Sequence, residues 1–125
     1  MAGALPAAPP ALSARAQQQG SGGVVIGFLT ALDAGDIDAA MAKWVPRPEV
    51  ELSTGERYDS PEAVRAYFES FPRPIEILDT LPWGGHRYEA RVLADGTPLL
   101  LTFEGAVGSI AYMYVEPDPS LARSE

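Results

Sequence analysis

The chain has 125 residues, the length of a single domain, and its 17 acidic against 9 basic residues give a formal net charge of −8. This balance disfavours nucleic acid and membrane surfaces as partners, because both are polyanionic. The absence of cysteine excludes disulfides, thiolate catalysis and cysteine-ligated zinc, and a single histidine, His86, cannot form a two-histidine metal site within one chain.

The first 23 residues differ in composition from the rest of the chain. They are rich in alanine, proline and glycine, and Pro6, Pro9 and Pro10 interrupt any apolar run. Because the basic start and the apolar middle of a secretion signal are both missing, we expect a cytoplasmic protein. We interpret residues 1–23 as a flexible tail, residues 24–117 as one folded domain and residues 118–125 as a second tail.

The domain begins with helical patterns that glycine and proline interrupt. Apolar residues recur at helical spacing, Gly35 can close the first helix, and Asp36 can cap the second. The later part alternates between apolar stretches and glycine-containing turns, which predicts strands in meander order. Helices followed by an antiparallel meander predict an α+β fold in which a curved sheet wraps the helices. The expected elements are helices over 24–34, 36–44 and 61–71 and strands over 50–53, 75–80, 86–93, 98–103 and 109–115.

One succession of segments resembles a known superfamily. The phrase Leu29 to Ala40, in which a glycine separates two helical patterns, is followed by Gly55, by the turn Tyr58-Asp59-Ser60-Pro61 and by a helix over 62–68. This order resembles the nuclear-transport-factor-2-like (NTF2-like) superfamily, and within it the SnoaL-like proteins. The resemblance implies a cone-shaped α+β fold, three N-terminal helices packed in a curved antiparallel sheet, and a hollow that holds ligands. We expect no cofactor, since the chain has no phosphate-binding glycine motif.

Strand alternation indicates which side chains face such a hollow. Tyr88 and Val92 share one face of their strand while Arg87 and Glu89 share the other, so we place the first pair inside. An interior this apolar suits a flat hydrophobic molecule, such as a polyketide or terpenoid fragment. The predicted ligand-binding residues are Phe28, Trp44, Leu52, Tyr67, Phe68, Tyr88, Val92, Leu100, Thr102, Met113 and Val115.

The last two strands carry apolar residues on both faces, and a sheet with a solvated outer face would not show that pattern. We therefore expect a second copy of the chain to cover the outer face in a homodimer. The contacts would involve Leu101, Phe103, Tyr112 and Tyr114. Coverage by the N-terminal tail is the alternative.

The acid/base residues of two enzyme groups of this superfamily are missing from the chain. Where its ketosteroid isomerases carry a tyrosine and two aspartic acids, the resemblance places Phe28, Leu52 and Leu100, which can neither abstract a proton nor stabilise an enolate. Its limonene-type epoxide hydrolases pair two aspartates through an arginine. Here Arg87-Tyr88-Glu89 directs its charges outward, and Met113 stands where the final aspartate would be.

A third group, the SnoaL-like cyclases, works with an aspartate or histidine in an apolar chamber. His86 is the available imidazole, and Glu104 is expected at the rim of the chamber. Two hypotheses follow. The chain is an isomerase, cyclase or hydrolase with His86 and Glu104 as catalytic residues, or it is a non-catalytic ligand-binding or dimerisation module of the same fold. An exposed His86 would favour the second hypothesis.

Overall fold

Caps and a glycine set the ends of the helices. The computed structural model describes residues 21–84, 86–106 and 108–119, so most of the predicted N-terminal tail lies outside the described residues. Asp36 caps α3 (Ile37–Met41) and Ser60 caps α4 (Pro61–Glu69), each accepting a hydrogen bond from the backbone N–H three residues further on. The first helix, α2 (Ser21–Asp33), begins at Ser21 rather than at residue 24, and Gly35 with a φ of 77° follows its end.

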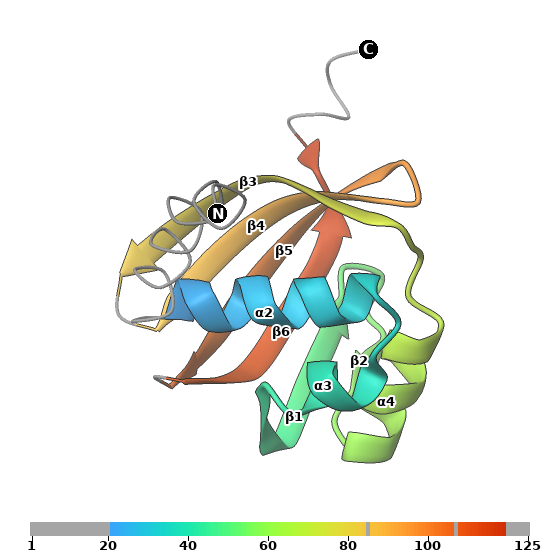
Figure 1. Cartoon of the computed structure of the whole chain (residues 1–125), viewed down its shortest axis with the longest axis vertical. Coiled ribbons are helices and arrows are strands. Elements are labelled where there is room, and N and C mark those ends of the chain that lie inside the picture. Colours follow the sequence, from blue (N-terminus) through green and yellow to red (C-terminus); the bar gives the residue numbers. More distant parts are fainter. Residues whose placement is uncertain (1–20, 85, 107, 120–125) are drawn as a thin grey trace, which may run out of the picture.

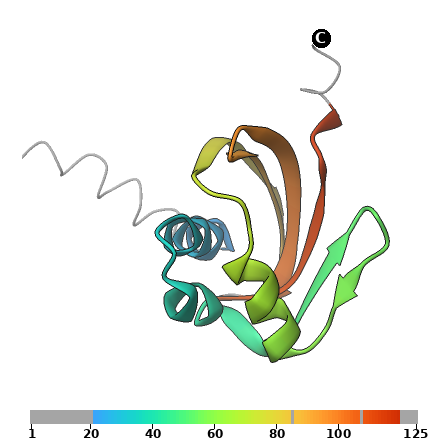
Figure 2. The ribbon, with the colours of Figure 1, turned by 90° about the vertical axis from the view of Figure 1, so that its right-hand side faces the viewer.

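Six strands form one curved sheet in the order β2-β1-β6-β5-β4-β3 (Figure 1). Neighbouring strands are antiparallel except β1 and β6, which run parallel. All three helices lie on one side of the sheet (Figure 2), which confirms the predicted α+β fold with its N-terminal helices packed in a curved sheet. The strands are β1 (Trp44–Leu52), β2 (Arg57–Tyr58), β3 (Ile75–Gly84), β4 (Arg87–Ala94), β5 (Thr97–Ala106) and β6 (Ser109–Pro117).

The register of the sheet defines its inner, helix-facing surface. Val50 of β1 pairs with Met113 of β6, Met113 stands opposite Phe103 of β5, and Phe103 stands opposite Tyr88 of β4. All four side chains are buried. Because residues directly opposite each other share a face of the sheet, this row marks the inner surface across four strands.

The same register corrects the prediction for β5. Leu100 and Thr102, expected inside, lie on the outer face, whereas Leu101 and Phe103, expected at the dimer contact, are buried in the core. The reason is that Phe103 stands opposite the inward-facing Tyr88, which fixes the orientation of every residue in β5. Since β5 is apolar on both faces, its own alternation carries no information about the core side.

The second helix is shorter than predicted, and the first strand is longer. α3 ends at Met41, and β1 begins at Trp44, which was expected to be the last residue of that helix. The pairing of β1 with β6 is irregular between Trp44 and Glu49. Pro46 and Pro48 fall in this stretch, where their missing N–H groups cost no ladder hydrogen bond.

Side-chain hydrogen bonds connect the ends of α2 and α4 to the start of β3. The carboxylate of Asp33 accepts a hydrogen bond from the Ile75 backbone N–H at 2.7 Å. The Arg73 guanidinium donates to the carbonyls of Leu32, at 3.4 Å, and Glu69, at 3.3 Å. These contacts fix where α4 lies over the sheet. Within the described part of the chain, no helix has the length and apolar character needed to cross a bilayer.

Candidate functional site

Aromatic rings pack together in the middle of the space between helices and sheet. The ring centroid of Phe28 lies 5.5 Å from that of Trp44, 5.1 Å from that of Phe68 and 6.0 Å from that of Phe103. The angles between these ring planes are edge-on or tilted, as aromatic pairs prefer. All four side chains are buried. Packed side chains therefore occupy this part of the interior, where the sequence predicted a ligand chamber.

An apolar hollow of about 240 Å³ remains where α4 faces the ends of β1 and β6. Leucine, valine, proline and aromatic side chains form most of its wall. Polar atoms come from Ser53, Thr54, Tyr67 and Glu116, and none of the residues that line the hollow is basic. The volume is slightly below the range of about 300–1,000 Å³ that is usual for small-molecule pockets. It therefore suits a molecule of one or two rings. The lining residues are Leu52, Ser53, Thr54, Tyr67, Phe71, Pro72, Leu99, Val115, Glu116 and Pro117.

Three of the residues predicted to contact a ligand, Leu52, Tyr67 and Val115, border this hollow. Leu100 and Thr102 lie on the other side of the sheet, so the prediction that they line the interior is wrong. The remaining six are buried core residues that do not line the hollow, namely Phe28, Trp44, Phe68, Tyr88, Val92 and Met113.

Tyr67 is held firmly in the wall of the hollow. Its ring stacks on Tyr58 of β2, with centroids 5.1 Å apart, and packs edge-on against Phe71 at 5.7 Å. Burial raises the pKa of the Tyr67 hydroxyl above its usual value, and the nearby Tyr58 and Glu56 raise it further. The hydroxyl therefore stays protonated at neutral pH, where it can donate a hydrogen bond.

The two predicted catalytic residues do not meet at the hollow. His86 is exposed in the turn before β4, where its backbone carbonyl accepts a hydrogen bond from the Gly105 N–H at 3.1 Å. Glu104 is exposed on the outer face and stands opposite Arg87 in the ladder. Neither side chain lines the hollow. A general acid or base must come within hydrogen-bond reach of the reacting group, so these positions do not favour the catalytic hypothesis.

A wider and more polar groove of about 410 Å³ crosses the outer face. Thr102 and Glu104 line this groove, which was not foreseen from the sequence. The Tyr112 hydroxyl donates a hydrogen bond to the Glu51 carboxylate at 3.0 Å. Burial, and then this hydrogen bond, raise the pKa of Tyr112 to about 12. The residues that line the groove are Glu51, Arg87, Thr102, Glu104, Tyr112, Tyr114 and Glu116.

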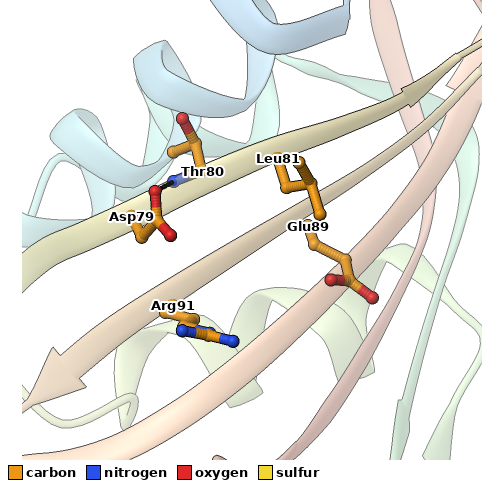
Figure 3. A pocket seen from close by; sticks show the side chains of 5 residues that line it. All are labelled: Asp79, Thr80, Leu81, Glu89 and Arg91. Carbon is orange, nitrogen blue, oxygen red and sulfur yellow. Dashed lines mark hydrogen bonds between the residues drawn. The ribbon is translucent and has the colours of Figure 1, made fainter.

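A small charged cleft lies between β3 and β4 (Figure 3). Asp79 stands opposite Arg91 in the ladder, and Leu81 stands opposite Glu89, while Thr80 points toward the helical side. Its volume of about 40 Å³ holds water but no organic ligand. Glu89 thus lies on the outer face, as its strand position predicted. Among the described residues, no group of three or more histidine or acidic side chains is arranged to hold a metal ion.

Comparisons with known proteins identify the architecture. No protein-family model matches the chain, and neither does any curated protein. An NTF2-like protein of unknown function from Cytophaga hutchinsonii superimposes with a TM-score of 0.65 at 15% identity, over 82% of this chain and 93% of that one. A SnoaL-like protein of unknown function from Burkholderia thailandensis gives 0.64 at 18% identity, over 74% and 88%.

The chain has the NTF2-like fold. The predicted resemblance is therefore confirmed for the architecture. A Kribbella flavida protein named as a candidate ketosteroid isomerase also superimposes, with a TM-score of 0.67 at 13% identity, over 82% of this chain and 78% of that one. At such identities the NTF2-like fold is shared without any implication for the reaction, because this fold carries sites of different chemistry.

Much of the wall of the hollow was missed from the sequence. Phe71 lies two residues beyond the end of α4 and continues the apolar spacing of that helix, a signal that was present in the sequence. Leu99 has the same strand parity as the core residue Leu101, so a correct orientation of β5 would have found it. Pro72, Glu116 and Pro117 carry no such signal. They meet only because the end of β6 passes beside the segment that follows α4.

Proposed function

We propose that this NTF2-like protein binds a small, mainly apolar molecule in the hollow between α4 and the inner face of β1, β5 and β6. The composition of the wall supports this proposal, since apolar side chains from four separate elements surround a space that protein atoms leave unfilled. Covering such surface with an apolar ligand removes it from water and is favourable. The polyketide- or terpenoid-like character of the ligand remains a prediction from the resemblance.

Binding without catalysis by His86 or Glu104 is the better supported of the two hypotheses. His86 is exposed at a turn, and Glu104 faces the groove on the opposite side of the sheet. The residues placed at the positions of the isomerase acids and tyrosine are also apolar, and one of them, Leu52, lines the hollow. Among the residues that line the hollow, Glu116 is the one carboxylic acid, and it stands opposite Leu100, so its side chain faces the outer groove as well.

Titration of the full chain with tetralin, a hydrocarbon of two fused rings, tests the proposal by NMR. We expect chemical-shift changes to concentrate at hollow residues such as Ser53 and Val115. Leu99→Trp enlarges a side chain of the wall and should abolish these changes. Leu100→Trp makes the same substitution one residue further on, at the outer face, and should preserve them. Changes that are absent, or equally large in both variants, would contradict the proposal.

We also propose that a second copy of the chain pairs with the outer face. Tyr112 and Tyr114 remain at that face, whereas Leu101 and Phe103 belong to the core. The groove contains Arg87 together with carboxylates, so two copies related by a two-fold axis can place this guanidinium against a carboxylate of the other copy. Sedimentation velocity should give the mass of two chains for the natural sequence and of one chain for Tyr114→Glu. A natural protein that sediments as one chain would refute the pairing.

A further inference from the structure

We propose that Tyr67 selects the ligand, because its hydroxyl donates a hydrogen bond to an oxygen acceptor on a neutral and otherwise apolar molecule. Ketones, esters and ethers belong to this class. The inference rests on the proposed binding function and deepens it by naming the chemical class that the hollow accepts.

The first argument is the geometry of Tyr67. Its ring forms part of the wall, and stacking on Tyr58 and the edge-on contact with Phe71 hold it on two sides. Among the described residues, none accepts a hydrogen bond from the Tyr67 hydroxyl. A partly buried donor without a protein acceptor gains most from a ligand that supplies one. Fixing the ring in advance also reduces the entropy lost on binding.

The second argument is the charge around the hollow. Glu56 lies close enough to Tyr67 to raise its pKa, while the residues that line the hollow include no Lys, Arg or His. An anionic ligand would lie near the Glu56 carboxylate without a compensating cation. A cationic ligand would lose hydration against an apolar wall, and the Glu56 carboxylate already accepts a hydrogen bond from Thr54 at 3.4 Å. A neutral ligand avoids both penalties.

The third argument is the protonation state of the hydroxyl. A tyrosine hydroxyl is already protonated at neutral pH, and burial raises the pKa of Tyr67 above its usual value, so the hydroxyl is a donor over the whole physiological pH range. It would make a poor base, since its anion is disfavoured in the same environment. The role that follows is recognition of an acceptor.

The experiment compares tetralin with 2-tetralone, which has a similar ring system and one carbonyl oxygen. Dissociation constants are measured by NMR titration for the natural sequence, for Tyr67→Phe and for Tyr114→Phe. A neutral hydrogen bond corresponds to about a 2- to 12-fold change in affinity. We expect Tyr67→Phe to weaken 2-tetralone by this factor and to leave tetralin unchanged. Tyr114→Phe, which removes a tyrosine hydroxyl from the outer face, away from the hollow, should alter neither constant.

Different outcomes overturn different statements. If tetralin does not bind the natural sequence at the hollow, the proposed binding function fails and the role of Tyr67 fails with it. If tetralin binds but Tyr67→Phe weakens both ligands equally, or neither, the binding function stands and the selection by Tyr67 is wrong. A third ligand, tetralin-2-carboxylate, should bind more weakly than tetralin, and tighter binding would overturn the neutral class.

Discussion

The orientation of β5 can be tested with two neighbouring leucines. Leu101 is fully buried on the inner face, and Leu100 lies on the outer face of the same strand. Truncating a fully buried leucine to alanine typically costs about 3 kcal/mol, from lost burial and the cavity that remains. For a domain of this size each kcal/mol lowers the melting temperature by about 5 °C, so Leu101→Ala should melt about 15 °C lower. Leu100→Ala should cost less than about 1 kcal/mol.

Urea unfolding followed by circular dichroism measures both variants under the same conditions. The two substitutions remove the same atoms from adjacent positions in one strand, so intrinsic strand propensity cancels in the comparison. The measurement is repeated at several protein concentrations, because a second copy covering Leu100 would make its cost rise with concentration. An equal cost for both variants at low concentration would refute the inner and outer assignment of β5, and with it the composition of the hollow.

Two further predictions concern the hairpin of β5 and β6 and the outer groove. A Cβ at Gly105 would overlap the backbone oxygen of Ser109, so Gly105→Ala should destabilise the fold by about 1–3 kcal/mol in urea unfolding. At Gly27 in α2 a Cβ meets only the flexible end of a lysine, so Gly27→Ala should be neutral or stabilising. Equal effects of the two substitutions would contradict the close contact at Gly105. Because the pKa of Tyr112 in the folded state is raised to about 12, the neutral hydroxyl contributes fully to the free energy of unfolding below pH 10, and this contribution is lost as the pH rises from 10 to 12. Tyr112→Phe should remove this part of the pH dependence of stability, together with the phenolate absorbance near 295 nm that appears late in the titration. An unchanged titration would refute the assignment.

Local sequence signals predicted the starts of α3 and α4 and the orientation of β4, because each pattern there has a single physical interpretation. Ser60 followed by Pro61 has the cap and first-turn residues of a helix, and the structure begins α4 there. In β4 the charged residues Arg87, Glu89 and Arg91 alternate with apolar ones, so that only one face can be buried. The inward orientation of this strand followed from the sequence alone.

The remaining errors concern features that depend on pairing between distant segments. β2 has only the two residues Arg57 and Tyr58, and it exists because they pair with β1. The orientation of β5 is decided by its neighbours, since its own residues are apolar on both faces. The start of β1 at Trp44 depends on its parallel pairing with β6, which no local pattern indicates.

The position of the hollow limits which residues could perform chemistry on a bound molecule. Proton transfer requires a group within about 3 Å of the reacting atom. Of the two titratable residues at the wall, Glu116 stands opposite Leu100 and so directs its side chain to the outer face, which leaves Tyr67. Tyr67 is held in its neutral form, so it can polarise an acceptor but not remove a proton. No side chain of the wall is therefore placed to act as a base on a molecule bound in the hollow. We expect the chain to bind 2-tetralone and leave it unchanged, and a reaction on the bound ketone that stops after His86→Ala or Glu116→Gln would contradict this reasoning.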